Sequence, residues 1–198
     1  MSPRTTHQYE KIRESRREMI MNTACELFAN YGYFRTSISM IAQKAGISKG
    51  LIYNYFESKE DLLKELIMTG LKAFHKNFDP NHDGTLTRKE LEFYIHEYFR
   101  MLEENREFWK MYFAIIIQPP VLEVLENDLS DIGIPMINIL YNYFKKQGYE
   151  DPLTQMELFS ATLSGIATKY VNSPENFHLE KLKPKILELF TQPNQHKK

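Results

Sequence analysis

The chain has 198 residues, of which 42% are hydrophobic and 26% are charged, so it can bury a core as one large domain or two small ones. Its single cysteine excludes an internal disulfide and suits a reducing compartment. No apolar run approaches the roughly 20 residues of a membrane-spanning helix, and the polar start lacks an apolar signal core, so a cytoplasmic protein is expected.

The net charge of −1 is unevenly distributed. Residues 1–60 hold nine Lys and Arg side chains against six Asp and Glu, whereas residues 61–198 hold sixteen against twenty. A basic front on an acidic body suits a DNA-facing end and a partner-facing end. The asymmetry is small, so it supports a DNA-binding motif and does not establish one.

Residues 1–10 are expected to form a loose arm, and the first helix is expected over residues 11–30. Its buried face is predicted from the helical spacing of apolar side chains, namely Ile20, Ala24, Leu27 and Phe28. Cys25 lies among them and is interpreted as a small core residue. Arginines in this region could touch phosphates or could simply be solvated, namely Arg4, Arg13, Arg16 and Arg17.

Residues 35–60 indicate two short helices joined by a tight turn. Thr36 and Ser37 can cap the first helix, Gly46 can end it, and Ser48 can cap the second. A unit of this length reads DNA when its second helix enters a major groove. The second helix and the residues after it carry side chains that can reach phosphates or base edges. The candidate DNA-binding residues are Thr36, Ser37, Ser48, Lys49, Gly50, Tyr53, Asn54, Tyr55 and Lys59.

Over about residues 15–65 this segment resembles the DNA-binding signature of the TetR family of repressors. The matching positions are 34–37, 41–42, 45–48, 50–53, 55–56 and 59–62, and Asn54 departs from the family, which often has His there. The resemblance implies an all-α protein. A three-helix DNA-binding domain over residues 1–57 would precede a helical ligand-binding and dimerisation domain over residues 58–198.

A fourth helix is expected from Ser58, which can cap it, to about Phe78. The stretch from Asp79 to Glu90 then fits the calcium-loop spacing D-x-[DN]-x-[DN]-G-x₅-E in every specified place. It resembles the loops of calmodulin-type EF-hands, with Leu86 as the apolar residue at the eighth position. The oxygen ligands for Ca²⁺ would come from Asp79, Asn81, Asp83, Thr85, Thr87 and Glu90.

The alternative for this stretch is a polar connector in which Thr87 only caps the next helix. That helix is expected to end near Glu104. An apolar, buried helix over residues 107–117 should follow and stop at two prolines. Further helices are expected over residues 121–126, 131–146, 152–172 and 179–190, with a break over 127–130.

The resemblance implies that the last long helices pair with a second copy of the chain, giving a homodimer that binds a palindromic DNA operator. It also implies an unknown small-molecule inducer in the helical body. The candidate pocket residues are Trp109, Tyr112, Phe113, Ile116, Met136, Leu140, Tyr143 and Phe159. Aromatic and Met residues at helical spacing belong to a core more often than to a pocket.

The function expected from the sequence is a DNA-binding transcriptional regulator that represses until a ligand releases it, with calcium bound at the domain junction. The alternative is a calcium-binding interaction protein without DNA function. An enzyme is not expected, because the sequence contains no metalloprotease, nucleophile-elbow, P-loop or dinucleotide signature.

Overall fold

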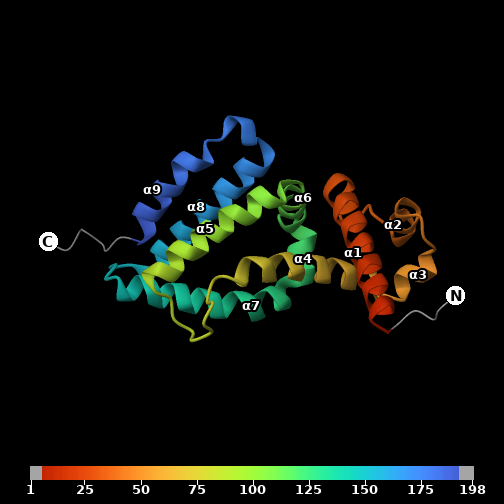
Figure 1. The fold of residues 1–198 in the computed structure, drawn as a ribbon, viewed down its shortest axis with the longest axis horizontal. Helices are drawn as coiled ribbons and strands as arrows, with labels where there is room; N and C mark the ends of the chain where they lie inside the picture. Colours follow the sequence, from red (N-terminus) through yellow and green to blue (C-terminus); the bar gives the residue numbers. More distant parts are fainter. Residues whose placement is uncertain (1–5, 192–198) are drawn as a thin grey trace. The chain divides into compact units, whose positions relative to one another are not determined.

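The computed structural model describes residues 6–191, and the regular structure within this range is entirely helical (Figure 1). This confirms the predicted all-α class. The helices are α1 (Thr6–Tyr31), α2 (Ile38–Ala45), α3 (Lys49–Tyr53), α4 (Lys59–His75), α5 (Arg88–Glu104), α6 (Arg106–Ile116), α7 (Pro119–Lys146), α8 (Pro152–Asn172) and α9 (Leu179–Thr191), with a short 3₁₀ turn at Pro174–Asn176. No single helix in the described range has the length and apolar character of a membrane span.

The chain forms two compact units. The first unit consists of the chain up to Gly70 together with Met111–Leu125, and the second consists of Leu71–Lys110 and the chain from Glu126 onward. Each boundary falls inside a helix, namely α4, α6 and α7. The boundary predicted between residues 57 and 58 falls just before α4 begins at Lys59.

The first unit contains α1, α2 and α3, with α1 packed against α2. The buried face of α1 is the predicted one: Ile20, Ala24 and Phe28 are fully buried. The Cys25 thiol is also buried, and this burial, with the nearby charge of Glu26, raises its pKa to about 12. Cys25 is therefore a core residue, as expected.

The predicted loose arm needs correction. Residues 6–10 are helical, because α1 begins at Thr6 and not near residue 11. Arg4 lies outside the described residues. The sequence misplaced the start because the first turns of α1 carry no apolar stripe, so periodicity gave no signal there.

Tyr112 of α6 packs against the part of α4 that lies in the first unit. Its ring is 1% exposed, and its hydroxyl donates to the carbonyl of Ile67 at 3.1 Å. A Cβ atom added to Gly70 would lie 2.1 Å from the Tyr112 ring. Glycine at position 70 therefore lets the helix backbone and the ring meet.

Gln118 joins the start of α7 to the end of α1 in the same unit. Its amide nitrogen donates to the carbonyls of Phe28, at 3.3 Å, and Ala114, at 2.9 Å. Its amide oxygen accepts the backbone N–H of Tyr33 at 3.1 Å. One side chain thus satisfies backbone groups from two segments that are far apart in sequence.

The second unit has an aromatic core between α5, α7, α8 and α9, and α5 packs beside α8 and α9 (Figure 1). Phe159 lies with its ring centre 5.1 Å from that of Phe190 and 6.1 Å from that of Phe144. The buried Tyr143 hydroxyl donates to the carbonyl of Phe190 at 3.2 Å. The Tyr98 hydroxyl donates to the carbonyl of Leu163 at 3.3 Å, which ties α5 to α8.

Expectations for the middle of the chain need correction, although α6 stops before the two prolines as predicted. The two prolines do not merely stop α6; they begin α7, because the first turn of a helix needs no backbone donor. The predicted break over 127–130 does not exist, and the helix continues through Pro135 to Lys146. The segment 107–117 is helical to Ile116 but only partly buried, and Ile117 is 72% exposed.

We expect Gly70→Ala to lower the free energy of unfolding by about 1–3 kcal/mol, because the new methyl group overpacks against the Tyr112 ring. Chemical denaturation followed by circular dichroism measures this. Gly133→Ala is the matched control, since Gly133 lies in α7 with no atom within 4 Å of the added Cβ. The control should be neutral or slightly more stable. Equal stability of the two variants would contradict the packing argument.

Candidate nucleic-acid interface and cation loop

The α2–turn–α3 unit is built by three local backbone devices. The Ser37 hydroxyl accepts the N–H of Met40 at 3.2 Å and caps α2. Gly46 ends α2 with φ of 65°, a left-handed conformation that suits glycine. The Ser48 hydroxyl then accepts the N–H of Leu51 at 3.1 Å and caps α3. These predicted devices fix the turn between the two helices.

The outer face of α3 is open and polar. Ile52 is fully buried, whereas Lys49, Gly50, Tyr53 and Asn54 are exposed. The Lys49 ammonium lies 5.9 Å from the centre of the Tyr53 ring. A cation, a phenol and an amide therefore share one accessible surface, beside a glycine that adds no bulk. Such groups can bind phosphates and the edges of bases.

The structure corrects the expectation for Thr36. This residue is 1% exposed, and its hydroxyl donates to the carbonyls of Gly32, at 2.9 Å, and Leu27, at 3.2 Å. Its role is to hold the end of α1 against the start of α2. Ser37, the next residue, is exposed and remains accessible.

Lys59 also acts within the protein. Its ammonium donates to the carbonyls of Tyr33, at 2.9 Å, and Thr36, at 3.0 Å, and lies 4.2 Å from the centre of the Tyr33 ring. Partial burial lowers its pKa. The sequence placed Lys59 at a helix start, where a phosphate contact is common, but could not show these carbonyl partners. Tyr55 is half-buried, with Arg13 lying 5.8 Å from the centre of its ring.

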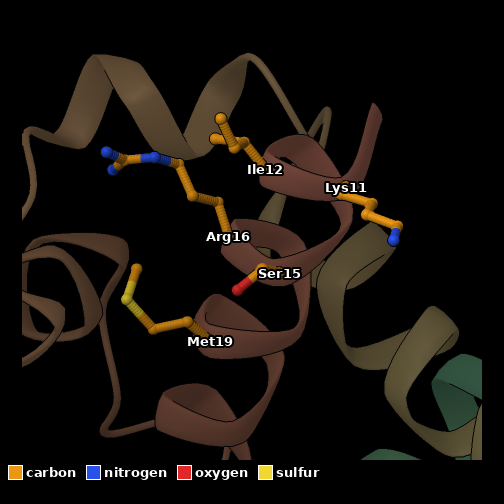
Figure 2. Close-up of a pocket in the computed structure, with 5 residues that line it drawn as sticks. All are labelled: Lys11, Ile12, Ser15, Arg16 and Met19. Atoms are coloured by element: carbon orange, nitrogen blue, oxygen red, sulfur yellow. The ribbon is translucent and has the colours of Figure 1, made fainter. Parts of the chain in front are cut away.

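The amino-terminal half of α1 has a shallow hollow of about 440 Å³, which sequence reasoning missed. Figure 2 shows Ile12, Arg16 and Met19 projecting from one side of α1, while Lys11 projects away from them. Arg16 and Lys11 are exposed, so both are available to an anion. Arg17, in contrast, forms an ion pair with Glu65 and lies 5.3 Å from the centre of the Phe56 ring.

The segment from Asp79 to Glu90 lies between α4 and α5 in the second unit. Asp79 Oδ2 accepts the N–H of Gly84 at 3.0 Å, and Gly84 turns the chain with φ of 72°. The other oxygen, Asp79 Oδ1, is buried and has no hydrogen-bond partner among the described residues. Leu86 is 5% exposed, as the loop pattern predicts.

The remaining oxygen ligands predicted for the loop are engaged locally. Asp83 Oδ1 accepts the N–H and hydroxyl of Thr85, at 2.8 and 2.7 Å, and these bonds lower the pKa of Asp83. Asn81 donates its side-chain amide to Asp83 Oδ2 at 2.9 Å. Thr87 caps α5, and Glu90 Oε2 accepts the Thr87 N–H at 2.7 Å, which completes a capping box. The capping box is the interaction that the polar-connector interpretation expects, while calcium binding stays a prediction.

The carboxylates of this loop do not converge. Within residues 6–191, no three His, Cys, Asp or Glu side chains are grouped closely enough to hold a metal ion. Asp79 presents a free oxygen, but Glu90 is committed to the capping box. A cation in the loop would therefore require Glu90 to turn away from Thr87.

The eight candidate pocket residues are mostly core residues. Five of them are at most 3% exposed, namely Trp109, Tyr112, Leu140, Tyr143 and Phe159. Phe113 and Ile116 are half-buried. Met136, also half-buried, lines a hollow of about 310 Å³ in the second unit, together with Lys72, His75, Asp79 and Ile139. Sequence reasoning missed this hollow, because its walls come from α4, the loop and α7.

Residues 20–66 match the family model described as "Bacterial regulatory proteins, tetR family". The chain is 27% identical over 182 residues to the fatty acid metabolism regulator protein of Bacillus subtilis, covering 86% of this chain and 91% of that protein. It is 47% identical over 74 residues to the HTH-type transcriptional regulator HbdR of Aromatoleum, covering 37% of this chain and 32% of that protein.

Two solved structures have a similar fold. The fatty acid degradation regulator FadR of Bacillus halodurans has a TM-score of 0.69 at 22% identity, covering 92% of this chain and 97% of that one. FadR of Bacillus subtilis, solved in complex with stearoyl-CoA, has a TM-score of 0.69 at 24% identity, covering 89% and 98%. At these identities the likeness shows the shared all-helical fold.

Proposed function

We propose that this chain is a dimeric repressor that binds a palindromic operator and is released by a small ligand, because residues 20–66 match the family model of tetR-family regulatory proteins. The observation that carries this proposal is the exposed face of α3, held in place by the Ser37, Gly46 and Ser48 devices. The alternative, a calcium-binding protein without DNA function, gives no reason for that face.

In this proposal α3 enters a major groove. Asn54 and Tyr53 contact base edges, Gly50 allows close approach, and Lys49 binds a phosphate. Arg16, exposed on α1, is suited to a further phosphate contact. Because phosphate contacts set affinity and base contacts set specificity, the two kinds of residue have separable effects.

A dimer suits the outer face of α8. Leu158 is 48% exposed, and Ala161 and Gly165 lie on the same helical face. An added Cβ at Gly165 would meet nothing within 4 Å. Small residues beside an exposed leucine let a second helix approach closely. A two-fold dimer would present two α3 helices to the two halves of a palindrome.

We propose a fatty-acyl compound as the releasing ligand. The similar Bacillus subtilis protein is named a fatty acid metabolism regulator, and the similar FadR structure contains stearoyl-CoA. The ligand would act through α4, which starts beside the α3 reading helix in sequence and continues without interruption into the second unit. A ligand that shifts the end of this helix can change how α3 is presented.

We also propose that the loop from Asp79 to Glu90 binds calcium. Support comes from the complete spacing of the loop, the buried Leu86 and the free Asp79 Oδ1 atom. That oxygen lacks a partner while Oδ2 of the same carboxylate accepts a loop N–H, which leaves Oδ1 available to a cation. The ion mainly fixes the exit from α4, because a single loop whose Glu90 is otherwise engaged binds weakly.

The DNA proposal is tested by mobility shift on fragments upstream of the gene. We expect binding that weakens with salt, and Lys49→Gln should reduce the slope of log affinity against log salt by about 1. Asn54→Ala should reduce the discrimination between bases at one operator position by about 1–3 kcal/mol. Lys181→Gln, an exposed α9 lysine, is the control for charge. No shift on upstream fragments or on a random DNA pool would favour the non-DNA alternative.

The dimer proposal is tested by sedimentation velocity. Wild type should sediment as a dimer, and Leu158→Glu should shift it to monomer, because the variant places a charge in the paired face. Ser160→Glu provides the control, since this exposed α8 residue lies toward the other edge of the helix surface. A Leu158→Glu protein that remains dimeric would place the interface elsewhere.

The calcium proposal is tested by calorimetric titration of chelator-treated protein in the presence of magnesium. We expect one ion per chain, with binding lost in Glu90→Gln, because an amide cannot replace the bidentate carboxylate. The amide oxygen can still accept the Thr87 N–H, so the fold should persist. Glu92→Gln, which lies beyond the loop on α5, should bind as wild type does. Equal heats in all three proteins would reduce the loop to a polar connector.

A further inference from the structure

The hollow in the second unit has walls of two chemical kinds. Its volume is about 310 Å³. Apolar side chains come from the start of the loop, where Phe78 is 2% exposed, and from α7, where Met136 and Ile139 are half-buried. Phe78 is held by the edge of the Tyr94 ring, with ring centres 5.0 Å apart. The hollow therefore has a fixed apolar wall that an aliphatic chain can contact.

The rest of the lining is polar and includes two exposed lysines. Lys72 is exposed on the last turn of α4, which ends at His75, and Lys76 is exposed directly after the helix. His82 adds a second imidazole from the loop. An exposed pair of ammonium groups above an apolar wall selects a ligand that carries an anionic group and an apolar chain. A neutral apolar compound would leave the lysines without a function in binding.

The carboxylate of Asp79 opposes the binding of an anionic ligand in the hollow. Asp79 lines the hollow and is also the first residue of the proposed calcium loop. Its Oδ1 atom is the buried oxygen without a partner. With the loop free of cation, this negative charge repels an anion in the hollow. A divalent cation bound to Asp79 offsets this charge and so removes the repulsion of the anion.

We propose that this hollow binds an anion with an apolar chain and that calcium in the loop strengthens this binding through Asp79. The inference rests on the proposed function, since it assigns that function's ligand to a site and makes the ion its co-regulator. By thermodynamic linkage, the ligand must raise the affinity for calcium by the same factor. This reciprocity gives two independent measurements of one coupling.

The experiment titrates lauroyl-CoA, laurate and unacylated coenzyme A into the full-length protein by calorimetry, in chelator and in sub-millimolar calcium, with protein-free blanks. We expect lauroyl-CoA or laurate to bind at least about fivefold more tightly with calcium present. Comparison of the three compounds distinguishes recognition of a carboxylate from recognition of phosphates, and coenzyme A alone should bind weakly because it lacks the apolar chain. Calcium titrated with and without the acyl probe should show the same factor.

Two sets of variants locate the effect. A Lys72→Gln, Lys76→Gln double variant should lose at least about tenfold in probe affinity, because both lysines line the hollow and can pair with an anionic group. The control variant Lys181→Gln on α9 should keep the wild-type affinity for the probe. Asp79→Asn should bind the probe in chelator about as tightly as wild type does in calcium, and calcium should have no further effect on it. Its amide oxygen can still accept the Gly84 N–H, and a thermal melt verifies its fold.

The outcomes separate this inference from the proposed function. Equal probe affinity with and without calcium, in a protein that binds both, would overturn the coupling and leave the repressor proposal intact. Probe binding that ignores Lys72 and Lys76 would overturn the site. Absence of probe binding would overturn both the site and the fatty-acyl class, while operator binding, measured separately, would still support a DNA-binding regulator.

Discussion

The contact between Tyr112 and the backbone of Gly70 joins α6 to α4 within the first compact unit. It places the segment Met111–Leu125 in the same compact unit as the first 70 residues. Gln118 reinforces this from the start of α7 by binding backbone groups of Phe28 and Tyr33. The first unit is therefore more than a three-helix module, and α4, α6 and α7 each continue from it into the second unit.

Local sequence signals predicted the parts of the fold that local physics controls. Ser37 and Ser48 cap helices where expected, because a side-chain oxygen needs only the N–H groups of the next turn. Long-range roles were not accessible in the same way. Thr36 and Lys59 have the composition of surface DNA contacts, yet their partners are carbonyls from residues 27 to 36 that only the folded chain brings near. The α7 prolines were similarly ambiguous, since proline both ends and begins helices.

The loop after α4 shows how one carboxylate can serve two structures. Glu90 holds the first turn of α5 through Thr87, a capping interaction of about 1 kcal/mol. The calcium geometry would use the same oxygens. In the proposed calcium-bound loop the capping bond is given up, so cation binding would be weaker by about the free energy of that bond, where 1.4 kcal/mol is a factor of about ten. The sequence predicted both roles for this stretch; the capping box engages Glu90, whereas Asp79 Oδ1 has no hydrogen-bond partner among the described residues.

The proposal involves three binding events, namely those of operator DNA, ligand and calcium. Whether each one strengthens or weakens the others determines how they combine. A ligand releases a repressor only if it binds the DNA-free conformation more tightly than the DNA-bound one, because equal affinity shifts no population. If calcium strengthens ligand binding equally in both conformations, it lowers the ligand concentration needed for release and leaves operator affinity unchanged when no ligand is present. If the exit angle of α4 differs between the conformations, the ion favours the one whose loop geometry it fits. Calcium would then alter operator affinity by itself, so DNA binding without ligand distinguishes a co-ligand from an independent effector.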